Sequence, residues 1–271
     1  MAQRFRIAIL SHNQAMTNRL VAIARFSVLE ALRTRLPLLT AGVILMLLGA
    51  SFFVREIAIA ESGRFQTAFY AATTRYAIAF VAMLYVIASV SREFQDKGLE
   101  LVLALDLARA EYVLGKLLGF LAIAGALALA VGVPLFALAG IEPAVQWTIS
   151  LGVELAVVVA LSLFCAITFN QLMPAAAVVI GFYLLARAIV AIRLISANPI
   201  AGADALSHQF MSWLVEGIAL VIPALELWTR TSWLVDQPAE WTALAAIVGH
   251  GGLFTIVLAA AAVFDFYRKN F

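Results

Sequence analysis

Long apolar runs with few or no charges dominate the chain, and short polar segments separate them. The runs cover residues 37–54, 71–91, 117–141, 155–186 and 241–264. About 20 apolar residues in a helix cross the roughly 30 Å hydrocarbon core of a bilayer. The run over 155–186 is too long for one crossing, because 32 residues of helix would reach about 48 Å.

A proline divides this longest run into two helices. Pro174 disfavours helical backbone at the residue before it, and Asn170 and Gln171 interrupt the apolar pattern just upstream. We therefore predict separate spans at about 144–169 and 174–195. The total is six spans, which places both termini on one side. The predicted fold is an all-α, polytopic membrane protein in which residues 1–271 form a single transmembrane domain.

Composition supports a membrane location. The chain is 64% hydrophobic with a mean hydropathy of +1.01, whereas soluble domains are about half apolar. A net charge of only +2 gives no reason to expect a nucleic-acid partner. Cys165 is the single cysteine, so the sequence predicts neither a disulfide framework nor a Cys/His metal site.

Basic residues indicate which side is cytoplasmic. The N-terminal segment, residues 92–116 and the C-terminal tail together hold 12 of the 18 Lys and Arg residues. Cytoplasmic loops carry such an excess, so we expect both termini to be cytoplasmic. The tryptophans fall near the predicted outer boundary, at Trp147, Trp213, Trp228, Trp233 and Trp241. Arg75 and Arg193 also lie near that boundary, and we expect them to reach the headgroups.

Two segments are predicted to lie outside the spans. Residues 18–36 are modestly amphipathic, which predicts a helix lying on the inner leaflet and ended by Pro37. A solvated basic anchor is the alternative interpretation of the same residues. Residues 196–240 are too mixed to span, and we predict a pair of short helices that enter the outer leaflet and return.

Small residues in two spans permit close helix approach. They are 124–126 and Gly132 in the third span, and Gly249, Gly251 and Gly252 in the sixth. This pattern is common in helix bundles and indicates packing rather than a function.

The densest charge in the chain lies between the second and third spans. Residues 92–116 contain nine charged side chains, while the whole chain is only 13% charged. Gly98 permits a turn, and the residues after it suit a short helix along the membrane surface. A soluble partner could hold such a helix through complementary charge. The alternative is a solvated loop whose charges only enforce topology.

Motifs for chemistry are missing from the sequence. Gly115-Lys116 lacks the upstream glycine and the following hydroxyl of a phosphate loop, so we do not expect this chain to hydrolyse ATP. Sequence patterns of metalloproteases and serine hydrolases are also missing. We predict no catalytic residue and no metal ligand.

Charged and polar residues inside the predicted spans form a second candidate site. Glu154, Arg187 and His250 all lie about 12–15 Å from the predicted outer surface. Unpaired charges at such depth are costly, so we predict that Glu154 pairs with Arg187, with His250 and Tyr183 nearby. The cluster is either a structural clamp between helices or part of the wall of a translocation path.

The order of features around the charged segment resembles ABC type-2 exporter permeases. The matching elements are Arg92-Glu93, 98–105, Arg109 and Gly115-Lys116 leading into the third span. The chain is most similar to the branch that includes the permease of the nitrous-oxide-reductase maturation transporter and the gliding-type permeases. It departs from many members at Asp106, where they have a nearby proline, and at Ala108, where Ser or Thr is common.

This resemblance implies a permease homodimer in the bacterial inner membrane, with an N-terminal interfacial helix and re-entrant helices before the last span. Two separate ATP-binding-cassette ATPase subunits would bind ATP and Mg, so this chain itself needs no cofactor. A periplasmic accessory protein is a further partner that the resemblance allows. Residues 92–110 would form the coupling helix, whose candidate contact or hinge residues are Arg92, Glu93, Asp96, Lys97, Gly98, Glu100, Asp106 and Arg109.

Two other functions fit the same sequence. The chain could be a membrane scaffold or regulator that recruits a cytoplasmic partner without transport. It could also be a membrane-embedded lipid enzyme that uses Glu154 and His250 for acid–base catalysis. The sequence does not identify a transported substrate.

Overall fold

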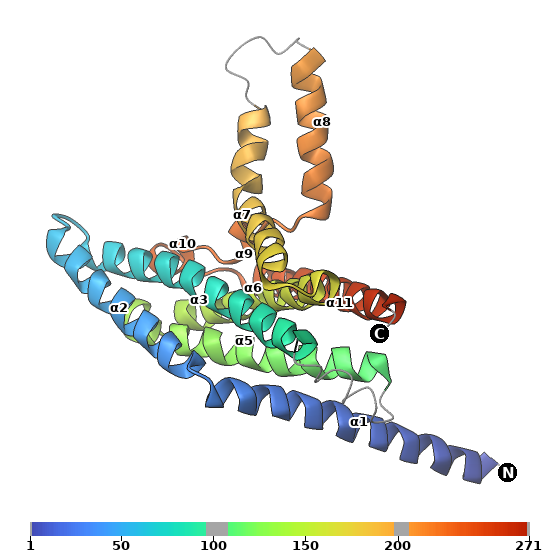
Figure 1. Cartoon of the computed structure of the whole chain (residues 1–271). Helices are drawn as coiled ribbons and strands as arrows, with labels where there is room; N and C mark the ends of the chain where they lie inside the picture. The colour runs from blue at the N-terminus through green and yellow to red at the C-terminus, as the bar shows by residue number, and fades with distance from the viewer. Residues whose placement is uncertain (1, 96–107, 198–205, 270–271) are drawn as a thin grey trace.

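The computed structural model describes residues 2–95, 108–197 and 206–269, and all regular structure within them is helical (Figure 1). The helices are α1 (Ala2–Arg33), α2 (Leu36–Ile57), α3 (Ser62–Gln95), α5 (Arg109–Ala139), α6 (Ile141–Phe169), α7 (Leu172–Ala197), α8 (Leu206–Val221), α9 (Leu225–Trp228), α10 (Ser232–Val235) and α11 (Trp241–Arg268).

Six of the described helices are long and apolar enough to cross a membrane, which is the pattern of a multi-pass membrane protein. They are α2, α3, α5, α6, α7 and α11, and they confirm the six predicted spans. The largest differences from the predicted starts are at α3, which begins at Ser62 rather than 71, and at α5, which begins at Arg109 rather than 117. Hydropathy marks only the apolar part of a helix, while its backbone hydrogen bonds continue into polar turns at either end.

Helix α6 forms the centre of the bundle. It packs against α3, α5, α7 and α11, and 72% of its most apolar stretch is buried. The corresponding values are 11% for α2 and 17% for α11, so these two helices lie at the periphery. Leu151 and Leu155 of α6 are completely buried within the core.

Two of the predicted small residues do allow helices to approach α6. A Cβ added to Gly132 of α5 would lie 2.1 Å from Thr148 Oγ1, and one added to Gly251 of α11 would lie 2.1 Å from Val153 Cγ1. Gly125, Gly249 and Gly252 have no such neighbour within 4 Å. Only glycines on the packed face of each helix therefore permit close helix approach.

Helix α1 runs alongside α5, and the location of residues 18–36 on the inner leaflet stays a prediction. Ile23 contacts Gly115 and Ser27 contacts Gly119, and Cβ atoms added to these glycines would lie 2.8 and 2.7 Å from the Cβ atoms of the two partners. The two contacts are four residues apart on each helix, so the helices run side by side. Two glycines four residues apart produce this arrangement, because they let the backbones approach closely.

The predicted break between the fourth and fifth spans is confirmed. Asn170 ends α6 in the left-handed conformation with φ 53°, and its N–H donates to Ala166 O. Helix α7 then starts at Leu172, with Pro174 inside its first turn. Proline is tolerated there because the first N–H groups of a helix have no partner within the helix.

The region between the fifth and sixth spans differs from the predicted pair of short helices. It contains the 16-residue helix α8 and the four-residue helices α9 and α10. Figure 1 shows α8 beside the end of α7, with both standing out from the other helices. Helix α9 packs on α6 and α7, and α10 packs on α3 and α6.

The tryptophans do not all form a boundary belt. Trp213 and Trp241 are exposed, but Trp147 and Trp228 are buried inside the bundle. These two indoles contact protein rather than lipid headgroups, so they do not act as lipid-facing anchors. Their apolar area instead stabilises the packing around α6.

Candidate functional site

The two helices that flank the charged segment are tied together where they meet it. Tyr112 Oη and Lys116 Nζ of α5 donate to opposite oxygens of the Glu93 carboxylate at the end of α3. Tyr112 and Lys116 are four residues apart, so they lie on the same face of α5. The Lys116 side chain is only 3% exposed, which makes this a buried ion pair.

Helix α1 joins the same cluster. Glu30 Oε2 lies 3.8 Å from Lys116 Nζ, and Ser89 Oγ of α3 donates to the Glu30 carboxylate at 3.3 and 3.4 Å. We call Glu30, Ser89, Glu93, Tyr112 and Lys116 the charged junction. It connects α1, α3 and α5 through one buried ammonium group and two carboxylates.

Arg109 extends these contacts to α11. Its Nη1 donates to the backbone oxygens of Phe266, Tyr267 and Lys269 at 3.2, 3.3 and 2.7 Å. The last carbonyls of a helix lack partners within the helix, so the guanidinium group caps α11. The start of α5 therefore lies directly against the end of the last span.

Lys269 connects the end of α11 to the end of α6. Its Nζ donates to the Ile167 and Thr168 carbonyls and, at 2.6 Å, to Asn170 Oδ1. Partial burial lowers the pKa of Lys269, and the nearby Asp265 carboxylate opposes this shift. The start of α1, the end of α11, the end of α3 and the start of α5 thus lie at one end of the bundle (Figure 1).

The predicted coupling residues fall into three groups. Glu93 and Arg109 are held by contacts within the chain, and Arg92 is exposed. The remaining candidates lie outside the described residues: Asp96, Lys97, Gly98, Glu100 and Asp106. Sequence reasoning missed Glu30 and Tyr112, and it did not identify Lys116 as a buried residue.

A second cluster surrounds Glu154, which is completely buried in α6. Arg187 Nη2 of α7 donates to both carboxylate oxygens, at 2.6 and 2.5 Å. Tyr183 Oη donates to Glu154 Oε1 at 2.9 Å. Thr229, the residue that follows α9, donates from its Oγ1 to Glu154 Oε2 at 2.7 Å. Tyr183 and Arg187 share one face of α7 because they are four residues apart.

Arg75 of α3 completes this cluster, and its predicted position at the headgroups was wrong. The side chain turns inward, the residue is 8% exposed, and its Nη1 donates to the Thr229 carbonyl. We call Arg75, Glu154, Tyr183, Arg187 and Thr229 the buried polar cluster. Thr229 could not be identified from the sequence, because its position depends on how the chain returns to the bundle after α8.

His250 does not belong to the buried polar cluster. Its side chain is exposed on α11, while the next residue, Gly251, faces Val153 of α6. Glu154 and His250 therefore do not form the acid–base pair that a lipid enzyme would require. Among the described residues, no group of three or more His, Cys, Asp or Glu side chains could hold a metal ion.

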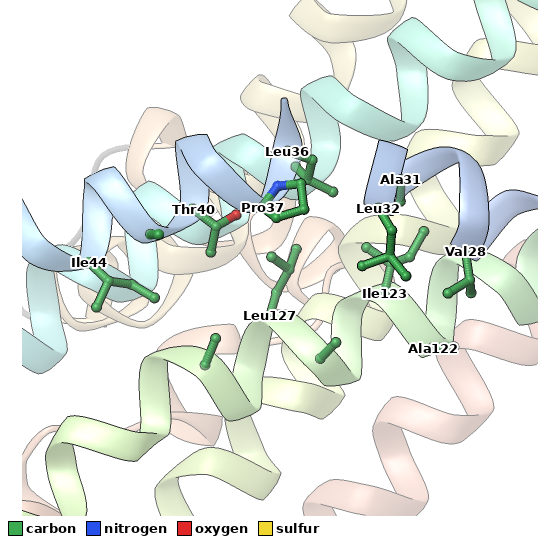
Figure 2. Close-up of a pocket in the computed structure, with 13 residues that line it drawn as sticks. Val28, Ala31, Leu32, Leu36, Pro37, Thr40, Ile44, Ala122, Ile123 and Leu127 are labelled. Carbon is green, nitrogen blue, oxygen red and sulfur yellow. The ribbon is translucent and has the colours of Figure 1, made fainter. Parts of the chain in front are cut away.

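An apolar cavity of about 290 Å³ lies where α1 meets α2, against α5. Figure 2 shows Leu32 and Pro37 on either side of the helix break, with Ile123 and Leu127 of α5 facing them. Thr40 Oγ1 is buried here without a hydrogen-bond partner among the described residues. The lining otherwise consists of aliphatic side chains and offers contacts to apolar groups only.

Comparison with known proteins does not identify a relative. No protein-family model matches the chain, and no curated protein matches it. Function must therefore be inferred from the charged junction and the buried polar cluster.

Proposed function

We propose that this chain is the membrane-spanning permease subunit of an ATP-binding-cassette exporter. Two copies would form the translocation path in a bacterial inner membrane, and two separate ATPase subunits would dock on residues 92–110. Both termini would face the cytoplasm. The sequence resemblance suggests this function, and the observation that supports it most directly is the charged junction.

The charged junction suits the transmission of force. A partner that moved residues 96–107 would act on the end of α3 and the start of α5. Contacts of Glu93 with Tyr112 and Lys116 resist separation of these two ends, while Glu30 and Arg109 connect them to α1 and α11. A loop that only enforced topology would not require a buried ammonium group with two carboxylates, which is costly to assemble.

Helix α3 also connects the two clusters. Glu93 at one end and Arg75 further along are 18 residues apart, or about 27 Å in a helix. A displacement of the junction end of α3 would therefore reach the buried polar cluster through a rigid element. In this mechanism, closure of the ATPase subunits moves α3 and α5. The translocation path between the two protomers then opens to the other side of the membrane.

Co-purification tests the proposal. The tagged chain is solubilised from native membranes, and bound proteins are identified by mass spectrometry and assayed for ATP hydrolysis. We expect an ATPase subunit to accompany the chain and to be lost when residues 96–106 are scrambled. A matched control scrambles 236–240, which lies at the opposite end of the bundle.

Two results would contradict the proposal. One is the recovery of no ATPase with the intact, folded chain. The other is equal recovery of the ATPase with the 96–106 variant. Recovery of a partner without ATPase activity would instead favour a scaffold or regulator.

A further inference from the structure

The buried polar cluster contains more positive than negative charge. Arg75 and Arg187 are 8% and 6% exposed, and Glu154 is the one carboxylate among the described residues that contacts this pair or its partners. Glu154 already accepts hydrogen bonds from Arg187, Tyr183 and Thr229. Arg75 is left with the neutral Thr229 carbonyl. An uncompensated cation at this depth is expensive in a membrane.

Several N–H donors of the two arginines are also unused. Arg187 contacts Glu154 through Nη2 alone, whereas strong arginine–carboxylate pairs commonly use two nitrogens. Arg187 Nε and Nη1 and Arg75 Nε are buried without a partner among the described residues. Buried donors without acceptors are destabilising, so these groups favour an additional acceptor of negative charge.

Tyr76 separates the two guanidinium groups from the surface of the bundle. The guanidinium carbons of Arg75 and Arg187 lie 5.0 and 5.6 Å from the centre of its ring. The residue itself is 36% exposed, and its ring also meets that of Tyr183 edge to face at 6.1 Å. Tyr76 is therefore a partly exposed neighbour that both guanidinium groups share.

We propose that Arg75 and Arg187 bind an anionic group, a carboxylate or a phosphate, of an amphiphilic molecule. Tyr76 covers the bound anion, and the acyl part lies along the apolar surfaces of α3 and α7. This inference deepens the proposed function, since it assigns the chemical class of the exported cargo. The site chemistry selects against zwitterionic and neutral lipids because only a molecule of net negative charge offsets the excess positive charge of the cluster.

Equilibrium binding to the purified full-length chain in detergent tests the site. The probe is phosphatidic acid with a fluorescent acyl chain, and its anisotropy reports binding. Unlabelled phosphatidic acid and phosphatidylcholine with identical acyl chains serve as competitors. We expect phosphatidic acid to compete at least tenfold better, in line with the strength of hydrogen bonds between charged groups.

The variant Arg75→Gln removes one cation without exposing Glu154, and we expect it to raise the dissociation constant about tenfold or more. Arg75→Lys should recover part of the affinity. Arg193→Gln is the matched control, because Arg193 is an exposed arginine on α7. We expect its dissociation constant to change less than about threefold, as for screened surface charges.

A separate titration with inorganic phosphate distinguishes the source of the anion. Displacement of the probe by phosphate alone would show that the headgroup suffices and that soluble anions also bind. Displacement only by the lipid would show that the acyl chain contributes. Either outcome supports an anion site.

The proposal is overturned if phosphatidylcholine competes as well as phosphatidic acid. This comparison uses the wild-type chain and remains informative even if Arg75→Gln does not fold. Equal affinity of folded Arg75→Gln and wild type would also overturn it. Loss of anion binding would leave the recovery of an ATPase unaffected, so failure of this inference and failure of the proposed function are distinguishable.

Discussion

Single residues at both clusters derive their importance from the direction of their side chains. Lys116 is the clearest case, because it lies at the start of an apolar run where a lysine commonly extends to the headgroups. Its side chain instead turns toward Glu93 and Glu30 and is only 3% exposed. A buried ion pair of this kind contributes little when intact but leaves an uncompensated charge when one partner is removed.

We predict that Lys116→Met destabilises the protein by about 3 kcal/mol, because both carboxylates lose their counter-charge. The midpoint of thermal unfolding in detergent measures this effect. Combining Lys116→Met with Glu93→Gln should restore much of the loss. Arg92→Met, at an exposed neighbouring charge, should change stability by less than about 0.5 kcal/mol. Similar midpoints for Lys116→Met and Arg92→Met would contradict the assigned pairing.

The contact between Glu154 and Arg187 yields a second prediction at this scale. Glu154→Arg and Arg187→Glu should each destabilise the protein by about 3–5 kcal/mol, because each places two like charges in contact inside the bundle. The double variant should be more stable than either single variant, since it restores an opposite pair. Thermal unfolding of all four proteins measures the coupling. A double variant that is no more stable than the singles would refute the pair.

Whole helices are positioned by a few glycines at crossing points. Gly115 and Gly119 let α1 pack along α5, and Gly132 and Gly251 let α5 and α11 approach α6. Other glycines in the same helices face open space and do not act in this way. The face on which a glycine lies therefore matters more than its presence in a span.

We predict that Gly119→Leu separates α1 from α5 and destabilises the protein by about 1–3 kcal/mol, the typical cost of overpacking. Gly125→Leu is the control, because no atom lies within 4 Å of its added Cβ. Limited proteolysis of α1, together with thermal unfolding, measures the effect. Equal resistance of the two variants to protease would contradict the close α1–α5 contact.

At the scale of the molecule, the charged junction and the buried polar cluster lie at different levels of one bundle and share α3. Glu93 belongs to the first and Arg75 to the second. If nucleotide-driven closure passes along α3, then the connection at Glu93 matters for coupling rather than for docking. In this view the charged junction transmits the movement, whereas residues 96–107 bind the ATPase subunit.

We predict that Glu93→Ala, if it folds, retains a bound ATPase but loses at least about tenfold of cargo-stimulated ATP hydrolysis, a coupling of about 1.4 kcal/mol. The purified complex in lipid nanodiscs, with phosphatidic acid as the cargo probe, provides the measurement. Arg92→Ala would show whether the effect belongs to the contact with Lys116 or to any charge at this position. Full stimulation in Glu93→Ala would exclude the junction as the coupling element.

Local features of the sequence determined the number of spans and the break between the fourth and fifth. Apolar runs of sufficient length require helices in a membrane, and Asn170 and Pro174 act on their own backbone to break the longest run. The depth of Glu154 and Arg187 also follows from counting residues along a helix. These properties depend on the solvent and on nearest neighbours in the chain.

Only the tertiary structure decided which face of each helix meets another. Successive residues of a helix point about 100° apart, so Gly251 packs against α6 while His250 is exposed. The same rotation turns Arg75 toward Thr229 and Lys116 toward Glu93. The sequence determines the position of a residue along its helix. The direction in which that residue faces depends on how side chains from distant parts of the chain pack together.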